Sequence, residues 1–199
     1  SRGFAPGDTL ALIASNIPEY AVVFHGVAVA GGICTPVNPT YNAKEIRFQL
    51  LDAGASKLVA IPEVLPAALE AIVGTAVTEV YVIGEHSDAT PMNELLSAEP
   101  IEQVPVDPAT QVMVLPYSSG TTGLPKGVML SHTNLVANLV QCDAMLTYDA
   151  HSSGLAALPF FHIYGMQILM NGLLSNGCTV VSMPRFDLVG ALELIQSHK

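Results

Sequence analysis

The stretch "PYSSGTTGLPKGVMLSH", Pro116–His132, places hydroxyl and glycine residues densely between two apolar segments. "VMVLPYS" leads into it and "KGVMLSH" leaves it, and both have the length and apolar character of strands. Glycine lets backbone N–H groups converge on an anion, Ser and Thr hydroxyls add donors, and a lysine neutralises negative charge. The stretch therefore predicts a loop that clamps the phosphates of ATP. The alternative is a solvated Ser/Thr/Gly hairpin turn.

The candidate phosphate ligands are Ser118, Ser119, Gly120, Thr121, Thr122, Gly123 and Lys126. Their order is not the Walker A pattern G-x-x-x-x-G-K-[ST]. Counted from Gly120, Lys126 falls at the lysine position, but Pro125 replaces the second glycine of the pattern and Gly127 replaces its Ser or Thr. This order disfavours a phosphotransferase of the Walker type. "GVAVAGG" also lacks the G-x-G start of a dinucleotide-binding loop.

Strand-like and helix-like segments alternate on both sides of this loop. The predicted strands are 9–15, 33–39, 57–61, 77–84, 112–118, 126–132, 154–160 and 178–184. The predicted helices are 18–30, 43–55, 62–74, 92–97, 134–146, 163–175 and 187–198. Such alternation predicts an α/β fold with largely parallel sheets flanked by helices. The nearly continuous apolar strands are typical of sheets covered on both faces.

Helix starts are marked by side chains that can cap the first turn. Asn16 with Glu19, and Asn42 with Glu45, have the spacing of a capping box. The segment from Ser131 to Asn134 offers caps for the helix that follows the loop. Residues 85–110 are rich in Pro, Asp and Glu, and we expect them to form surface connections around a short helix.

Composition excludes several classes of protein. The 199 residues are 50% hydrophobic and only 12% charged, against roughly 25% charged in an average soluble domain. This balance suggests either a membrane protein or part of a larger globular protein. A spanning helix needs about 20 apolar residues, and the best run, "YAVVFHGVAVAGGICTPV", is interrupted by His25, two glycines and Pro36. We therefore expect no membrane span.

The charge and the cysteine content limit the binding partners and the cellular compartment that we expect. The formal net charge is −10 with only 7 Lys and Arg, which do not cluster, so nucleic-acid binding is disfavoured. Cys34, Cys142 and Cys178 lie far apart and have no metal-ligand spacing. We expect reduced core thiols and a cytoplasmic protein.

"YSSGTTGLPKGVMLSH" resembles the phosphate-binding signature of the adenylate-forming superfamily. That superfamily includes acyl-CoA synthetases, aryl-CoA ligases, luciferases and the adenylation domains of peptide synthetases. "GVAVAGGICTPVNPTYNAKEIRFQLLDAGA", "LPFFHIYGM" and "GCTVVSMPRFD" are similar to further segments of it. The last two are most similar to 4-coumarate–CoA ligases and their fatty-acyl relatives. The resemblance runs almost from end to end and implies the fold of a partial N-terminal domain.

The resemblance implies two half-reactions. The carboxylate of an acid attacks the α-phosphate of ATP, giving acyl-AMP and pyrophosphate; the thiol of CoA then attacks the acyl carbon and expels AMP. The implied partners are a small carboxylic acid, ATP and CoA, with Mg²⁺. Ser118 to Thr122 would hold the β- and γ-phosphates, Lys126 would add positive charge, and Thr122 would contact Mg²⁺.

Three residues downstream receive roles by the same resemblance. His162 would lie beside the substrate carboxylate and act with Lys126 in catalysis, and Tyr164 would line the acyl group. The alternative for His162 is a hydrogen-bonded core histidine. Arg185 corresponds to a basic position that meets CoA phosphates, and the alternative is a solvated charge at a strand end.

Family members are longer than this chain. We expect residues 1–199 to be a fragment of the large N-terminal domain, with 1–110 as a first α/β part and 111–199 carrying the phosphate loop and acyl pocket. The adenine and ribose segments, the lid lysine and the C-terminal lid domain are not found, so we expect the fragment alone to be inactive. The alternative function is a non-catalytic nucleotide-binding or scaffold module. Aryl and fatty-acyl substrates both stay open, and we expect self-association through exposed apolar surface.

Overall fold

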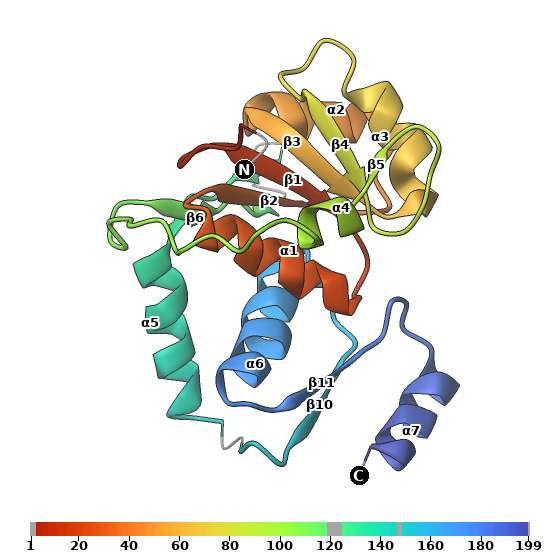
Figure 1. The fold of residues 1–199 in the computed structure, drawn as a ribbon. Coiled ribbons are helices and arrows are strands. Elements are labelled where there is room, and N and C mark those ends of the chain that lie inside the picture. The colour runs from red at the N-terminus through yellow and green to blue at the C-terminus, as the bar shows by residue number, and fades with distance from the viewer. Residues whose placement is uncertain (1–2, 119–124, 147–148, 199) are drawn as a thin grey trace.

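The computed structural model describes residues 3–118, 125–146 and 149–198 (Figure 1). Its main sheet contains β1 (Thr9–Ile13), β2 (Ile33–Val37), β3 (Ala55–Ala60), β4 (Glu79–Val82), β5 (Thr90–Pro91), β6 (Val112–Val114) and β9 (Leu130–Ser131). Their spatial order is β5-β4-β3-β1-β2-β6-β9. Every neighbouring pair is parallel except β6 and β9. The predicted α/β fold with largely parallel strands is confirmed.

Two small sheets accompany the main one. β10 (Ser153–Ala156) pairs in parallel with β11 (Thr179–Ser182). β7 (Tyr117–Ser118) and β8 (Lys126–Gly127) form an antiparallel pair. The segments 112–118 and 126–132, each predicted as one strand, are therefore two short strands apiece. Pro116 follows β6 and has no N–H to offer the ladder, and the chain there leaves the main sheet for the β7–β8 pair.

The helices are α1 (Pro18–Val29), α2 (Ala43–Asp52), η1 (Pro62–Val64), α3 (Leu65–Ala71), α4 (Asn93–Leu96), α5 (His132–Asp143), η2 (Gly165–Gly172), α6 (Leu173–Ser175) and α7 (Leu188–Ser197). Alternate residues of β1 face opposite sides, as the period of a strand requires. Leu10 and Leu12 join the core that includes α1, whereas Ala11 and Ile13 join the core beneath α2 and α3. Helices therefore cover both faces of the central strand.

Two of the three predicted helix caps are present. Asn42 accepts from the N–H groups of Lys44 and Glu45, and the Glu45 carboxylate accepts from the Asn42 N–H, which completes a capping box. Ser131 and Asn134 form the same arrangement at the start of α5. The predicted cap at Asn16 is wrong: α1 begins after Ile17 without a side-chain cap. The Asn16 amide is instead committed to a segment 140 or more residues away.

The segment 163–175, predicted as one regular helix, is mainly the π-helix η2. Gly165 explains the close packing at its start, because a Cβ there would lie 2.0 Å from the carbonyl oxygen of Pro159. The strand β5 falls within 85–110, where only a short helix and surface connections were predicted. Its pairing with β4 extends the main sheet by one edge strand.

Candidate functional site

The β7–β8 hairpin places two of the predicted phosphate ligands opposite each other. Ser118 and Lys126 are cross-strand partners, and both side chains are exposed. Ser119, Gly120, Thr121, Thr122 and Gly123 lie outside the described residues, and so does the predicted Mg²⁺ contact of Thr122. Among the residues that the structure describes, no carboxylate pairs with the Lys126 ammonium. Its positive charge is therefore available to an anionic ligand.

The hairpin is fastened to the end of α2 by one hydrogen bond. The Tyr117 hydroxyl donates to Asp52 Oδ2 at 2.5 Å. Burial, and then the bond to the Asp52 carboxylate, raise the pKa of Tyr117 above its ordinary value, so the phenol stays protonated as a donor. Gly127 lies against the same ring, where a Cβ would approach to 3.2 Å. These contacts fix the two short strands that flank the hydroxyl-rich segment 119–124.

His162 and Tyr164 lie in the turn between β10 and η2. The His162 N–H donates to Pro159 O at 3.1 Å, and the Tyr164 N–H donates to His162 Nδ1 at 3.3 Å. Both side chains are exposed, with Tyr164 at 52%. The structure therefore does not bury His162 in the core, which was the alternative to a binding role.

The hairpin and this turn both lie at the end of the main sheet where its parallel strands have their carboxyl ends. The chain reaches the hairpin after the carboxyl end of β6, and Thr35 of the intervening β2 donates to Leu115 O at 3.0 Å. Asn16 follows the carboxyl end of β1 and bonds to residues 156–160. Ligands of open parallel sheets bind at the carboxyl ends of the strands. Arg185 is exposed in the connection from β11 to α7, and within the described part of the chain it forms no hydrogen bond or ion pair with the hairpin.

Two buried side-chain amides in η2 were not predicted from the sequence. Gln167 Nε2 donates to Leu135 O of α5 at 2.7 Å, and Asn171 Nδ2 donates to Gln167 Oε1 at 2.8 Å. Both residues are nearly inaccessible, at 3% and 7% exposure. Their i, i+4 spacing within an apolar segment was the available signal. They join η2 to α5, the helix that follows the predicted phosphate loop.

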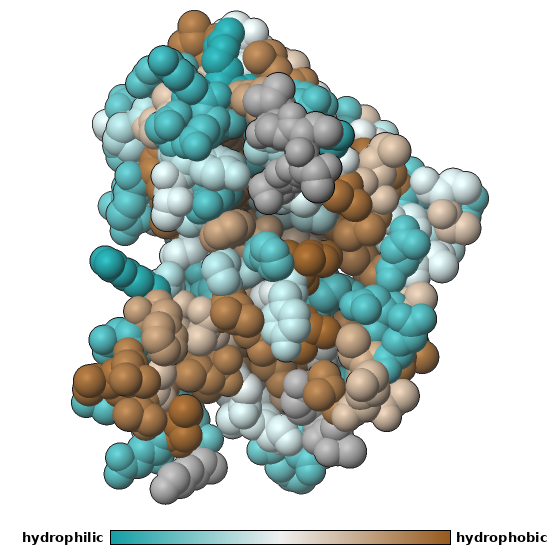
Figure 2. Space-filling model, turned by 180° about the vertical axis from the view of Figure 1, so that it is seen from behind, coloured by the Kyte–Doolittle hydropathy of each residue, from teal (hydrophilic) through white to brown (hydrophobic). Residues whose placement is uncertain are grey.

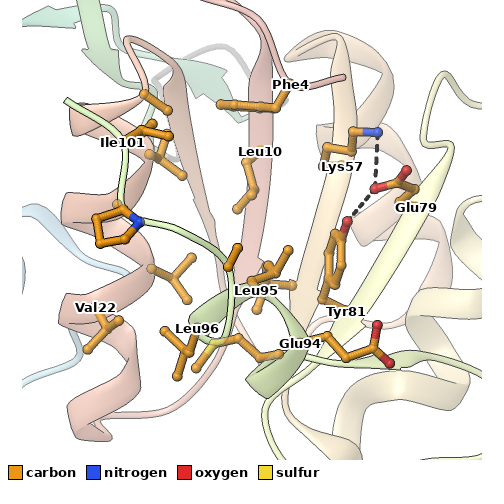
Figure 3. A pocket seen from close by; sticks show the side chains of 18 of the residues that line it. Phe4, Leu10, Val22, Lys57, Glu79, Tyr81, Glu94, Leu95, Leu96 and Ile101 are labelled. Atoms are coloured by element: carbon orange, nitrogen blue, oxygen red, sulfur yellow. Dashed lines mark hydrogen bonds and ion pairs between the residues drawn. The ribbon is translucent and has the colours of Figure 1, made fainter. Parts of the chain in front are cut away.

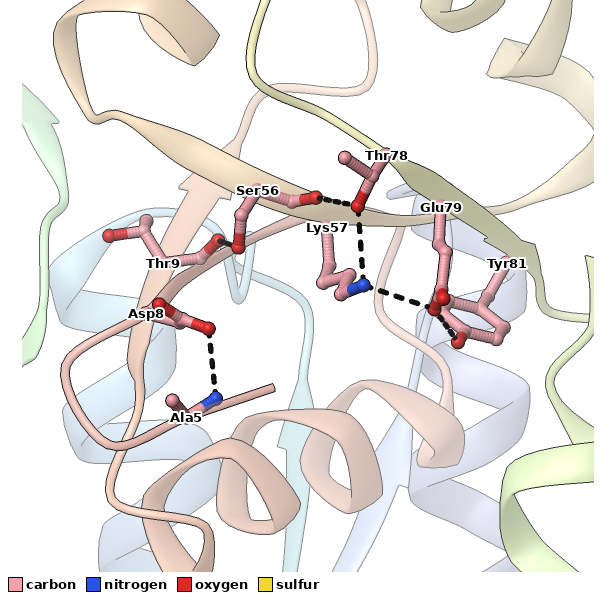
Figure 4. A network of polar contacts seen from close by, with 8 residues as sticks. All are labelled: Ala5, Asp8, Thr9, Ser56, Lys57, Thr78, Glu79 and Tyr81. Carbon is pink, nitrogen blue, oxygen red and sulfur yellow. Dashed lines mark hydrogen bonds and ion pairs between the residues drawn. The ribbon is translucent and has the colours of Figure 1, made fainter. Parts of the chain in front are cut away.

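A cavity of about 460 Å³ lies elsewhere, between α1, α4 and the strands β1, β3 and β4 (Figure 3). Apolar side chains line most of it, and none of the predicted site residues does. At its polar end the buried Lys57 ammonium contacts Glu79 Oε2 at 3.2 Å and donates to Thr78 Oγ1 at 3.2 Å (Figure 4). The Tyr81 hydroxyl donates to the same Glu79 carboxylate. This network satisfies a cation that would otherwise be costly to bury.

The described residues include three free cysteines, but no metal-binding cluster and no helix that could span a membrane. Cys34, Cys142 and Cys178 are all free, and burial raises the pKa of the Cys34 thiol to about 12. Within residues 3–118, 125–146 and 149–198, no group of three or more His, Cys, Asp or Glu is placed to hold a metal ion. No helix in that part of the chain is both long enough and apolar enough to cross a bilayer.

The environment of His132, the last residue of the stretch 116–132, indicates that the folded state loses stability at acid pH. Desolvation lowers the pKa of His132 below 6.5, and its Nε2 is buried with no hydrogen-bond partner among the described residues. Below about pH 6.5 the unfolded chain therefore binds more protons than the folded one, so stability falls as pH falls. We expect the urea midpoint of His132→Gln to drop less than that of the wild type between pH 7.5 and 5.5. An equal drop in both proteins would contradict the assignment.

Comparison with known proteins gives a consistent result. Residues 1–199 match the sequence model of the family described as "AMP-binding enzyme". The chain is 35% identical to a probable 4-coumarate–CoA ligase of Dictyostelium discoideum, covering 97% of this chain and 39% of the relative. It is 30% identical to a long-chain-fatty-acid–CoA ligase of Bacillus subtilis, covering 100% of this chain and 41% of that protein.

Solved structures give the same picture. The crystal structure of a long-chain-fatty-acid–CoA ligase from Archaeoglobus fulgidus has a TM-score of 0.91 at 28% identity, over 99% of this chain and 39% of that one. ATP-bound MatB from Rhodopseudomonas palustris has a TM-score of 0.87 at 25% identity, over 98% of this chain and 39% of that one. The chain thus spans about two fifths of the length of these relatives. Because the family model matches residues 1–199, this chain belongs to the AMP-binding enzyme family, the adenylate-forming group whose signature the segment 117–132 resembles.

Proposed function

We propose that the whole protein is an AMP-forming ligase that converts a carboxylic acid to acyl-AMP with ATP and then transfers the acyl group to CoA. The observation that carries this proposal is the β7–β8 pair, which sets Ser118 opposite Lys126, and no carboxylate among the described residues pairs with Lys126. It occurs in a chain that matches the AMP-binding family throughout. ATP supplies the leaving group that makes the carboxylate reactive.

In this proposal the hairpin binds the β- and γ-phosphates. Ser118, Ser119, Gly120, Thr121, Thr122 and Gly123 offer hydroxyl and backbone donors, and Thr122 contacts Mg²⁺. Lys126 stabilises the negative charge that moves onto the departing pyrophosphate, which is the main demand of phosphoryl-group chemistry on a protein. The Tyr117–Asp52 bond supports this role by holding the hairpin against α2.

We propose that His162 borders the substrate carboxylate and Tyr164 the acyl group. Their exposure in a turn at the carboxyl edge of the main sheet supports access for a small molecule. Arg185 would meet the phosphates of CoA, and its exposed guanidinium is compatible with that. The free cysteines support a reducing, cytoplasmic location.

Tyr164→Ala in the whole protein should change the preference among acids. The side chain is 52% exposed in the turn, so its loss opens space for the acyl group and removes little packing. We expect the ratio of kcat/KM values for 4-coumarate and hexadecanoate to shift by about tenfold, the scale of one or two methylenes in an apolar pocket. Phe186→Ala serves as the control, because Phe186 is an aromatic residue outside the turn that is also more than half exposed, at 61%. A uniform decrease for both acids would contradict the pocket assignment.

We also propose that residues 1–199 form part of a larger N-terminal domain. Residues 1–110 would be its first α/β part, residues 111–199 would carry the phosphate loop and acyl pocket, and a lid domain would come from the rest of the whole protein. The greater length of the relatives supports this division of the whole protein into parts. A non-catalytic nucleotide-binding or scaffold module is the second candidate function, and activity of the whole protein separates the two.

The 199-residue polypeptide by itself should self-associate. Hydrophobic side chains gather at the lower left of Figure 2, over α7, where Leu188, Val189, Leu192 and Ile195 are all more than half exposed. Apolar surface of this kind marks an interface or an aggregation liability. Light scattering at micromolar concentration should give a mass well above 20.9 kDa. A sharp monomer peak would contradict the prediction, and Leu192→Lys should move the distribution toward monomer.

Product analysis tests the proposed function. The whole protein is incubated with ATP, Mg²⁺, CoA and a panel of aryl and fatty acids, and nucleotide and thioester products are identified by mass spectrometry. AMP and an acyl-CoA should appear together, in equal amounts and only with an accepted acid. Acid-independent ADP would contradict a ligase and indicate phosphoryl transfer instead, whereas no turnover with any acid would contradict a ligase and favour the non-catalytic module.

A further inference from the structure

We propose that Asn16 is the positioning residue for the acyl-binding turn, holding the backbone from which His162 and Tyr164 project. The inference rests on the proposed function, because the roles of His162 and Tyr164 belong to it. Asn16 itself lies outside the turn, three residues after the end of β1 in the main sheet. It acts on the turn through the backbone of residues 156–160.

The Asn16 amide makes three hydrogen bonds to that backbone. Its Nδ2 donates to Ala156 O at 2.9 Å and to Leu158 O at 2.8 Å. Its Oδ1 accepts from the Phe160 N–H at 2.8 Å. With 3% exposure, the side chain has almost no contact with water. Two acceptors and one donor therefore fix the orientation of the amide.

These bonds begin where the regular pairing of β10 ends. β10 stops at Ala156, and Pro159 in the next turn has no N–H to offer. Asn16 bonds to every second residue, 156, 158 and 160, as a neighbouring strand would. One side chain thus supplies the hydrogen bonds that a neighbouring strand would give to the irregular stretch between β10 and η2.

The held stretch leads directly into the turn. Phe160 is buried and packs edge-on against Tyr20 of α1, with ring centroids 5.6 Å apart. Two residues later, His162 is tied to Pro159 O on one side, and its own carbonyl accepts from the Met166 N–H at 3.0 Å on the other. His162 therefore sits between an anchor at Asn16 and an anchor in η2. Loss of the first leaves the turn with the packing of Phe160 on Tyr20 and the anchor in η2.

Asn16 also connects two sheets that share no strand. β1 is in the main sheet, whereas Ala156 ends β10 of the β10–β11 pair. The phosphate hairpin leaves the main sheet through β6, so Asn16 sets the acyl-binding turn relative to the sheet that carries the phosphate site. In-line attack of a carboxylate on a phosphate depends on that relative placement, and a misplacement of about 1 Å can cost about 100-fold in rate.

The test compares Asn16→Ala, Asn16→Asp and Asn42→Ala in the whole protein. Asn16→Ala removes all three bonds; Asn16→Asp keeps the acceptor for Phe160 but turns a carboxylate oxygen toward two carbonyls. Asn42→Ala is the matched control, because it also removes an asparagine that binds backbone N–H groups, but at the start of α2. Two readouts are taken: amide hydrogen exchange by peptide, and acid-dependent ATP–pyrophosphate exchange below the unfolding temperature.

Both Asn16 variants should exchange at least tenfold faster in peptides covering 157–166, with the strands β1 to β4 unchanged. The kcat/KM for the accepted acid, 4-coumarate or hexadecanoate, should fall by about 10- to 100-fold while the KM for ATP stays within about twofold. Asn42→Ala should do neither. Faster exchange spread evenly over the protein, or acid and ATP parameters that change together, would overturn the inference. If the wild type activates no acid, the proposed function fails, and the exchange pattern alone still supports or overturns the anchoring of 157–166 by Asn16.

Discussion

Lys126→Ala in the whole protein should slow acyl-adenylate formation by about 100-fold, the scale for removing one preorganised group that stabilises transition-state charge. Lys126 stands opposite Ser118 in the β7–β8 hairpin, and no described carboxylate neutralises it. In the proposed mechanism, its removal takes positive charge from the place where pyrophosphate departs. Single-turnover measurement of acyl-AMP formation isolates this step from thioester formation.

The matched control is Lys44→Ala, which removes an exposed lysine from α2. It should leave the adenylation rate within about twofold of the wild type, since surface charges away from a site contribute little. Stability should be unaffected by either substitution. An adenylation rate in Lys126→Ala equal to that of Lys44→Ala would remove Lys126 from the proposed phosphate site.

Gly165→Ala should destabilise the fold by about 3 kcal/mol or displace the turn before η2, because overpacking against backbone has no flexible side chain to yield. The added Cβ would lie 2.0 Å from Pro159 O and 2.7 Å from Leu158 O. Both carbonyls belong to the stretch that Asn16 holds. Urea unfolding of the whole protein measures the loss, and the activity with the accepted acid should fall with it.

Gly26→Ala provides the opposite expectation in the same protein. Gly26 lies within α1, and a Cβ there meets nothing within 4 Å. Replacing a helical glycine by alanine should stabilise by about 0.5–1 kcal/mol. If Gly165→Ala were as well tolerated as Gly26→Ala, the close packing of η2 on residues 158–159 would be wrong.

Local patterns predicted most of the fold because most elements here are decided locally. The apolar runs around Leu10, Cys34 and Leu58 read as buried strands, and each lies in the main sheet. Asn42 and Glu45 form the box that their spacing predicts. Asn16 and Glu19 have the same spacing. The Asn16 amide nevertheless bonds to three backbone groups of residues 156, 158 and 160 instead of capping the helix. A partner so distant in sequence leaves no local signal.

The chemistry of the candidate site stays a prediction from the sequence, and its geometry was only partly predictable. The order of Ser118 and Lys126 indicated a phosphate loop, but their cross-strand register depends on the break at Pro116, which divided a predicted strand. The π-helical winding of η2 has no counterpart in the apolar pattern of 163–175, which reads as an ordinary helix. Gln167 and Asn171 became meaningful only once α5 was seen to pack beside them.

Acid-dependent exchange of labelled pyrophosphate into ATP, measured on the whole protein without CoA, tests the central claim most directly. It reports the reversible formation of acyl-AMP, the step assigned to the hairpin and the acyl-binding turn. The account predicts exchange with at least one aryl or fatty acid, none without acid, and a strong decrease in Lys126→Ala. A well-folded whole protein that binds ATP but catalyses no exchange with any acid in the panel would contradict it.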